Sequence, residues 1–297
     1  MRVTFNSQYR DAAAGIAEAT ERLVEAQRQV SSGRRVAKPS DDPSAAAGAV
    51  AERAQLAAAE QYVRAGNSTT SRLNVTDSIL GNVLETLTAV QSAALSGQGS
   101  TKSAAEREAA AQQIEGLRAS LLTDFNATFH GTYIFAGAAA TTKPFVETGG
   151  VVGPYAGSTT EVSVDISGVR SVTVGFNGDA IARGSDATDV FAVLTDLATA
   201  LRAGDDAGIT TARDGIARAF DRATTAQTRV GIALKAIETE QLRLQDLKLT
   251  ATERLSKLQD ADMAQAITDM TRAEAAYQAA LAATAKSARL SLLDYLG

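Results

Sequence analysis

The sequence predicts a mainly α-helical protein with a small inserted β domain, built as a long antiparallel helical bundle or coiled coil with adjacent N- and C-termini. Three observations predict it: long runs of apolar residues at alternating steps of four and three, a central stretch of β-branched alternation, and apolar content dominated by small and aliphatic residues. Aromatic residues make up only 5% of the 297 residues, and there is no tryptophan. We therefore expect long helices rather than a thick globular core.

Matching apolar seams lie at the two ends of the chain. The N-terminal seam has the spacing of a helix that packs along another helix, and it comprises Phe5, Tyr9, Ala12, Ile16, Ala19, Leu23, Ala26 and Val30. The C-terminal seam, interrupted only by the polar Glu274, comprises Met263, Ile267, Met270, Tyr277, Leu281, Thr284 and Ala288. Because chain ends fray most easily, we expect these surfaces to pack against each other and then against other copies.

A connecting loop is expected after the first seam, because residues 31–43 contain two prolines, a glycine and several turn-forming Ser and Asp residues. Pro43 suits the first position of a helix, with Ser40 or Asp42 capping it. That helix is expected to reach a turn at residues 97–103, and its apolar row is Leu73, Thr76, Leu80, Val83, Leu87, Val90 and Ala94. A further helix is expected from residue 104 to about Phe129.

The character of the sequence changes at Gly131. Residues 161–166 and 171–174 alternate β-branched and polar side chains, and the last two prolines also lie in this region, so a small antiparallel β domain is expected. Helix returns near Val190. From residue 209 to residue 258, every seventh position reads Ile, Ile, Ala, Val, Ile, Leu, Ala, Leu, which predicts one continuous helix. Helices that leave and return in this way lay the two halves of the chain side by side.

Five segments are expected from these patterns. They are an N-terminal coiled-coil segment at 1–35, the N-terminal half of a helical rod at 36–130, the β domain at 131–186, the C-terminal half of the rod at 187–262 and a C-terminal coiled-coil segment at 263–297. Ordering each backbone residue costs roughly 1–2 kcal/mol before hydrogen bonds offset part of it. The N-terminal seam offers only five large side chains, each stabilising by roughly 1.5–3 kcal/mol when buried. We predict that both terminal segments are largely disordered in the monomer and fold against neighbouring copies.

Composition and isolated motifs argue against several classes of function. The net charge of −5, without clustered Lys and Arg, does not favour a nucleic-acid partner. No apolar stretch approaches membrane-spanning length, and the N-terminus lacks the pattern of a cleavable signal peptide. The adjacent Asp41 and Asp42 are interpreted as capping groups, and the sole histidine, His130, as a structural residue at a helix end. We therefore predict no enzymatic activity, no metal and no cofactor.

A family resemblance then emerges from the loop at residues 31–47, SSGRRVAKPSDDPSAAA. It resembles the signature after the first helix of bacterial flagellins and of the flagellar hook-filament junction proteins, and its proline-flanked form is closer to the junction proteins. The signature residues are Ser32, Gly33, Pro39, Asp41, Asp42 and Pro43. Residues 34–37 read Arg-Arg-Val-Ala and depart from the pattern more usual in these proteins, a basic residue followed by isoleucine and asparagine. Stretches at 131–137, 143–145, 155–157, 258–267 and 290–296 extend the resemblance over essentially the whole chain.

The resemblance implies a flagellin-like structural subunit of the bacterial flagellum that joins hook to filament outside the cell. It implies export without a cleavable signal peptide through the flagellar type III system, with a cytosolic chaperone holding the C-terminal seam. The implied partners are further copies of the chain, a neighbouring hook-associated protein and flagellin. Two alternatives remain: a flagellin that forms the filament itself, and an intracellular coiled-coil scaffold, which would also show heptads.

Overall fold

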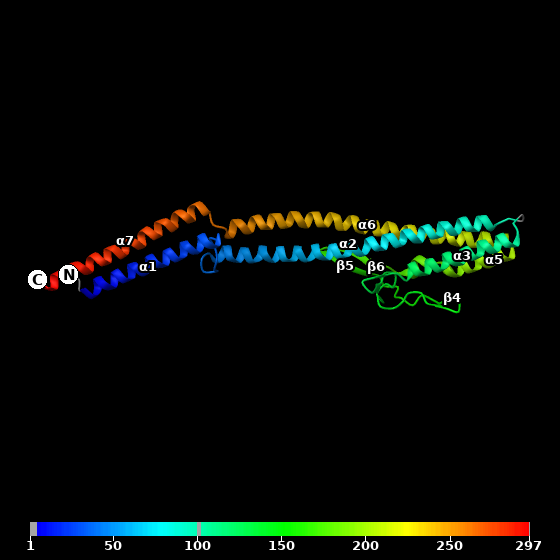
Figure 1. Cartoon of the computed structure of the whole chain (residues 1–297), viewed down its shortest axis with the longest axis horizontal. Helices are drawn as coiled ribbons and strands as arrows, with labels where there is room; N and C mark the ends of the chain where they lie inside the picture. Colours follow the sequence, from blue (N-terminus) through cyan, green and yellow to red (C-terminus); the bar gives the residue numbers. More distant parts are fainter. Residues whose placement is uncertain (1–4, 100–101, 297) are drawn as a thin grey trace. The chain divides into compact units, whose positions relative to one another are not determined.

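The computed structural model describes residues 5–99 and 102–296, and it describes the side-chain surroundings of residues 10–99 and 102–286. Figure 1 shows a chain made mainly of helices, with short strands in the middle of the sequence. The helices are α1 (Phe5–Ser32), α2 (Pro43–Gly97), α3 (Ala104–Phe125), α4 (Gly178–Ala182), α5 (Val190–Ala203), α6 (Asp206–Gln259) and α7 (Met263–Leu296). The strands are β1 (Thr128–Phe129), β2 (Thr132–Tyr133), β3 (Glu147–Thr148), β4 (Val151–Val152), β5 (Val162–Ser167) and β6 (Arg170–Gly175). The predicted fold class is confirmed.

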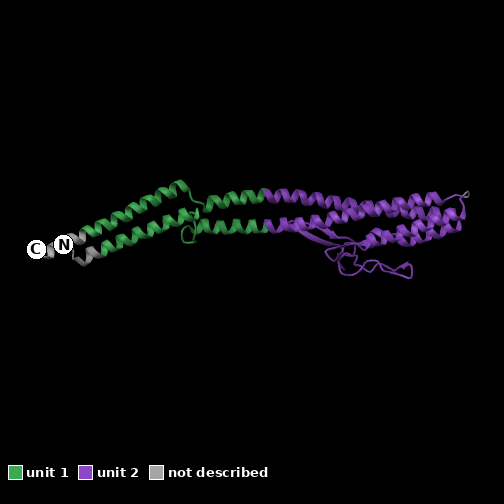
Figure 2. Cartoon of the chain, viewed as in Figure 1, with its two compact units in different colours: residues 1–58, 246–297 green, residues 59–245 purple. Residues whose placement is uncertain are grey.

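The chain divides into two compact units, which Figure 2 shows in different colours. The first comprises residues 1–58 and 246–297, and the second comprises residues 59–245. The first unit therefore holds α1, α7, the start of α2 and the end of α6. The second holds the remaining helices and all the described strands. The division of the chain into five segments stays a prediction.

In the first unit, α1 and α7 pack along each other, and the start of α1 lies beside the end of α7 (Figure 1). The described ends of the chain, at the start of α1 and the end of α7, are therefore adjacent, as predicted. The start of α2 and the end of α6 also approach closely in this unit. A Cβ added at Gly48 would lie 3.1 Å from Leu258 Cδ1, so a small residue is favoured where the two helices meet.

In the second unit, α2, α3, α5 and α6 contribute to one apolar core. The whole predicted row of α2 from Leu73 to Ala94 is buried. The α6 positions from Ile209 to Leu244 that were predicted to share a face are buried as well. Thr76, the polar member of the α2 row, satisfies its buried hydroxyl by donating to the Arg72 carbonyl at 2.9 Å. The helical periodicity therefore predicted the buried face correctly.

The β region forms three separate two-stranded antiparallel hairpins over the described residues. The longest pairs β5 with β6, where Val164 lies opposite Val172, so the predicted antiparallel strands are confirmed. The alternation is interrupted, because a register shift between Asp165 and Ser167 leaves Ile166 and Ser167 both buried. The region shares its core with the helices. The ring of Phe145 lies 5.5 Å from that of Phe125 on α3 and 5.1 Å from that of Phe191 on α5. These aromatic contacts attach the β region to the helical bundle.

One predicted boundary is wrong. The helix expected to reach about Phe129 ends at Phe125, and Phe129 lies in β1. Asn126 ends the helix, because its Nδ2 donates to the Leu122 carbonyl and to the Phe145 carbonyl, each at 2.9 Å. His130 consequently lies in the exposed turn between β1 and β2, with a φ of +48°, rather than at a helix end.

Candidate assembly site

The seam residues of α1 are only partly enclosed by α7. Ile16, Leu23 and Val30 are half-buried. Phe5 and Tyr9 belong to α1, but their side chains lie outside the described residues. The most buried seam positions described on α1 are two of its alanines, Ala19 at 9% and Ala26 at 8% exposure. The small residues therefore make the helix-helix contact, and the larger ones keep exposed surface.

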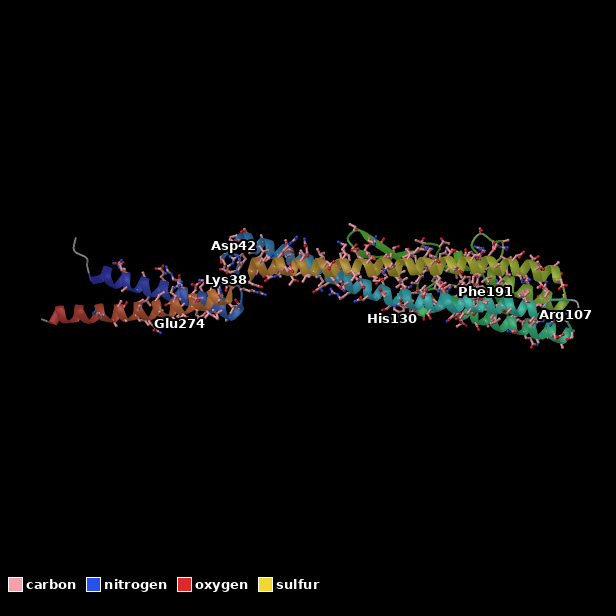
Figure 3. The ribbon with its side chains drawn as sticks, turned by 90° about the horizontal axis from the view of Figure 1, so that it is seen from above. Lys38, Asp42, Arg107, His130, Phe191 and Glu274 are labelled. Atoms are coloured by element: carbon pink, nitrogen blue, oxygen red, sulfur yellow. The ribbon has the colours of Figure 1, made fainter. Side chains whose placement is uncertain are left out.

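The seam of α7 is exposed to a greater degree. Met263, Ile267 and Leu281 keep 41%, 49% and 42% of their surface exposed. Met270 and Tyr277 are half-buried, as is the polar Glu274, whose place on α7 is labelled in Figure 3. Among the described side chains of α7, the buried apolar one is Ala266, at 4% exposure. The pairing of α1 with α7 thus leaves large apolar side chains available for further contacts.

A groove of about 560 Å³ lies between α1 and α7. Its lining combines small and charged residues, among them Ala26, Ala273, Ala276, Glu21, Arg22, Asp269 and Arg272. Arg272 pairs with Asp269 at 3.2 Å on α7. Arg22 pairs with Glu18 at 2.5 Å on α1. These pairs are formed within each helix, so they do not close the groove.

The loop that follows α1 begins with a left-handed glycine. Gly33 has a φ of +66°, and its N–H donates to the Gln29 carbonyl at 2.9 Å, which ends the helix. A Cβ at this position would meet no atom within 4 Å. Glycine is therefore favoured here for its backbone conformation rather than for lack of space. The neighbouring Ser32 accepts a hydrogen bond from the Arg34 N–H at 3.2 Å.

The two adjacent aspartates organise the rest of this loop, where Figure 3 labels Lys38 and Asp42. Asp42 caps α2, because its Oδ1 accepts from the Ala45 N–H at 3.0 Å, and Pro43 is the first residue of that helix. Asp41 Oδ2 accepts from the N–H groups of Ala37 and Lys38, at 3.0 and 2.9 Å. The geometry therefore gives the capping role to Asp42, rather than to Ser40, whereas Asp41 holds the loop that precedes the helix.

Backbone hydrogen bonds lower the pKa of both carboxyls. The N–H of Lys38 is the main cause at Asp41, and the N–H of Ala45 is the main cause at Asp42. Nearby arginines act in the same direction, since Arg28 approaches Asp41 at 3.4 Å and Arg35 approaches Asp42 at 3.5 Å. Both carboxyls are thus held in the ionised form that the loop requires.

Main-chain hydrogen bonds join this loop to the residues between α6 and α7. The Gln259 carbonyl accepts from the N–H groups of Arg35 and Val36, at 2.7 and 3.2 Å. The N–H of Ala261 donates to the Gly33 carbonyl at 2.9 Å. Val36 is buried at this contact, with 2% exposure. We call these contacts, between residues 33–42 and 258–262, the joint.

Three side chains that the sequence did not single out, those of Arg35, Arg53 and Gln259, complete the joint. Gln259 is buried, and its Oε1 accepts from Arg53 Nη2 on α2 at 2.7 Å. Arg35 Nη2 donates to the Leu258 carbonyl at 3.1 Å. Asp262 then caps α7 by accepting from the N–H of Ala264 at 2.9 Å. Pro39, the remaining signature residue, is exposed. The arrangement connects four helix ends without placing reactive groups together.

Among the residues whose side chains the structure describes, 10–99 and 102–286, no three His, Cys, Asp or Glu side chains lie close enough together to hold a metal ion. No helix in the part of the chain that the structure describes has the length and apolar character needed to cross a membrane.

Comparison with known families agrees with this geometry. The model of the bacterial flagellin N-terminal helical region matches residues 3–140, and the model of the C-terminal helical region matches residues 214–296. The chain belongs to the flagellin family, whose members are structural proteins of the bacterial flagellum. A structural role in the flagellum follows from this membership.

Two individual relatives indicate which members of the family this chain resembles. The chain is 29% identical to the flagellar hook-associated protein 3 of Escherichia coli (strain K12) over an alignment of 317 positions, gaps included, with 99% of each chain covered. It is 26% identical to the protein of the same name from Salmonella typhimurium over an alignment of 302 positions, with 94% of each chain covered. The likeness to these relatives therefore extends from the helical ends through the β region.

Solved structures share the fold. A putative flagellar hook-associated protein from Vibrio parahaemolyticus matches with a TM-score of 0.70 and 17% identity, covering 74% of this chain and 100% of that one. FlgL of Xanthomonas campestris matches with a TM-score of 0.61 and 18% identity, over 68% and 98% of the two chains. FlgL of Bacillus cereus matches with a TM-score of 0.59 and 21% identity, covering 69% of this chain and 99% of that one.

Proposed function

We propose that this chain is an adaptor that joins the flagellar hook to the filament, and that it assembles through its terminal helices. The observation that carries the proposal is the unequal burial of the terminal seams. Ile267 and Leu281 on α7 remain 49% and 42% exposed although α1 and α7 pack together. Two further copies of the chain supply the missing surface in the proposed assembly, one lateral and one axial.

The joint supports the same proposal. An adaptor must hold its terminal helices in a defined register to the helices that continue from them. The bonds from Arg35 and Val36 to the Gln259 carbonyl fix that register through the main chain, and the bond from Arg53 fixes it through a side chain. Contacts between main-chain atoms are insensitive to side-chain motion, so they suit a subunit that transmits force.

The proposed partners are further copies of this chain, a neighbouring hook-associated protein and flagellin. The full-length likeness to relatives named flagellar hook-associated protein 3 supports this choice. We further propose export through the flagellar type III system without a cleavable signal peptide, assisted by a cytosolic chaperone that holds the C-terminal seam. The chain would then act outside the cell, at the junction of hook and filament, and have no catalytic role.

A second candidate is a flagellin that forms the filament itself, because both matching family models are those of flagellin. The two functions differ in the extent of assembly. An adaptor forms a short layer at the end of the hook, whereas a flagellin polymerises extensively. Immunolabelling of isolated flagella with an antibody to this chain separates them: a band at the hook boundary supports the adaptor, and labelling along the filament supports the flagellin.

The role of the terminal helices is tested by Ile267→Ser. Ile267 is an exposed apolar residue of α7, so the substitution should leave the monomer folded and exported. We expect the variant to accumulate in the culture medium rather than in the flagellum. Circular dichroism of the purified variant checks its fold, and immunoblots of medium and flagella measure its distribution.

Ile232→Ser is the matched control. Ile232 is the same residue type, is 65% exposed and lies on α6 in the second unit. This variant should enter the flagellum as the unmodified chain does. If Ile267→Ser also incorporates normally, the terminal seam is not the assembly surface. Deletion of the last ~30 residues, which removes most of α7, should abolish incorporation while the β region still folds.

A further inference from the structure

Asn177 and Gly178 form an Asn-Gly dipeptide at the start of α4. In such a pair, the peptide nitrogen of the glycine can attack the side-chain amide of the preceding asparagine. Glycine has no Cβ to hinder the approach, and it gives the backbone the freedom to bend toward that amide. An exposed, unfolded Asn-Gly pair is therefore chemically labile.

The fold favours asparagine at position 177 and glycine at position 178. Asn177 caps α4, because its Oδ1 accepts from the Asp179 N–H at 3.0 Å. Gly178 passes close to another segment, since a Cβ at this position would lie 2.7 Å from the Phe135 carbonyl oxygen and 3.3 Å from Phe145 Cε2. A capping side chain followed by a residue without a side chain yields this labile dipeptide.

The folded structure also blocks the reaction. The attacking atom would be the Gly178 nitrogen, and its N–H donates to the Phe135 carbonyl at 2.9 Å. The backbone of Asn177 is paired with Ala136 in an antiparallel bridge. The amide that would be attacked is held by its own capping bond. The nitrogen cannot turn toward the amide carbon until this corner of the fold opens.

We propose that Asn177 is a site of spontaneous deamidation that folding masks. In the unfolded chain, the Gly178 nitrogen loses its proton and forms a bond to Cγ of Asn177. The Cγ–Nδ2 bond breaks, and the amide nitrogen leaves as ammonia after taking up a proton. Water then opens the five-membered imide at one of its two carbonyls, which gives aspartate or isoaspartate. No oxidant, reductant or co-reactant other than water takes part.

The two products differ in their effect on the fold. Aspartate keeps a capping oxygen at the start of α4. Isoaspartate adds a methylene group to the main chain, between two hydrogen bonds that need fixed spacing: Gly137 N–H to the Phe176 carbonyl at 3.0 Å, and Gly178 N–H to the Phe135 carbonyl at 2.9 Å. Phe135 is fully buried at this corner. A chain with isoaspartate at 177 therefore cannot rebuild the packed corner.

The chemistry of the masked site is independent of the proposed function, but its consequence for the cell rests on the proposed export route. Under the proposed export route, a chain that waits unfolded would expose Asn177 throughout that time. Chains damaged by long delay would then be unable to complete the second unit after export.

The test compares the full chain aged in native buffer with the same chain aged in concentrated guanidinium chloride, at one pH and temperature. Peptide mapping by mass spectrometry follows deamidation at 177, and enzymatic methylation measures isoaspartate. We expect deamidation at least about tenfold faster in denaturant, because reaction in the native state requires local opening. Asn126, followed by Ala127, is the internal comparison and should react much more slowly when unfolded. Equal rates in the two solutions, or no preference for 177 over 126 in denaturant, would overturn the proposal.

Two further measurements test the structural consequence. Asn177→Ser keeps a capping oxygen but has no amide, so it should fold normally and give no product at 177. After ageing in denaturant, the unmodified chain is refolded, and its folded fraction should contain less isoaspartate at 177 than the total. If the folded fraction contains as much isoaspartate as the total, the inferred effect of the extra methylene is wrong.

Discussion

The terminal helix pair and the helical core of the second unit have the same four-three apolar spacing but bury it to different degrees. Leu80 and Leu87 in the core are 0% and 1% exposed, whereas Ile267 and Leu281 on α7 are 49% and 42% exposed. Helices α2, α3, α4, α5 and α6 all contribute side chains to the core, whereas the described packing of α1 is against α7. Two helices cannot enclose a stripe of large side chains as several helices can. Periodicity therefore predicts that a face will be packed, but not that the same chain supplies the packing.

The largest expected difference is between two leucine truncations. Leu80→Ala should lower the free energy of unfolding by about 2–5 kcal/mol, because it leaves a cavity in a closed core. Leu281→Ala should cost less than about 1 kcal/mol in the monomer, because its side chain already contacts solvent. Guanidinium chloride unfolding measures both. Equal losses would mean that the terminal pair is a closed intramolecular core.

Two glycine substitutions should change the stability of the protein by smaller amounts and in opposite directions. Gly33→Ala should destabilise by about 1–2 kcal/mol, because φ at Gly33 is +66°. Gly15→Ala, in the middle of α1, should stabilise by about 0.5–1 kcal/mol through helix propensity. A Cβ meets no atom within 4 Å at either position, so crowding does not distinguish them. The temperature at which the assembled protein loses helicity should fall for the first and rise for the second. A rise in both would show that the left-handed end of α1 is not needed.

The smallest expected effect is the acid sensitivity of the joint. The pKa of Asp41 and of Asp42 is lowered in the folded chain, chiefly by backbone hydrogen bonds. Their contribution to stability is therefore complete above the unfolded aspartate pKa of about 3.9 and is lost as the pH falls through the lower folded values. Hydrogen exchange at the amides of Arg35 and Val36, corrected for intrinsic rates, should show the joint opening in that range.

Asn variants control this measurement. Asp42→Asn keeps a capping oxygen that does not titrate, so the joint should lose less protection in acid than it does in the unmodified chain. Combining it with Asp41→Asn should reduce the acid effect further. If the double variant opens over the same pH range and to the same extent, these carboxyls do not control the joint.

How far the sequence predicts the structure depends on the distance over which each signal acts. The buried row from Leu73 to Ala94 follows from spacing along one helix, and it was predicted residue by residue. The cap at Asp42 follows from a neighbouring proline and was predicted with Ser40 as the alternative. The predicted end of α3 was wrong by four residues. The side-chain amide of Asn126 ends the helix, and it is held by a hydrogen bond to the carbonyl of Phe145, which lies 19 positions away.

The joint shows more strongly that sequence patterns predict contacts between neighbouring residues but not between distant ones. The loop was recognised from Gly33, Pro39 and the two aspartates, but its partner was not. Gln259 lies in a helix-compatible stretch, and its bond to Arg53 joins residues 206 positions apart. The available signal was a glutamine directly after Leu258, the last position of a long apolar row, because an amide buried there needs partners. That signal does not identify which residue provides them.

The most direct test of the account is hydrogen exchange of residues 10–32 and 263–286, measured by mass spectrometry in the dilute monomer and in the assembled protein. We predict rapid exchange in the monomer and strong protection after assembly, while the core helices are protected in both states. Protection of the terminal helices in the monomer equal to that of α2 and α6 in the second unit would contradict the account.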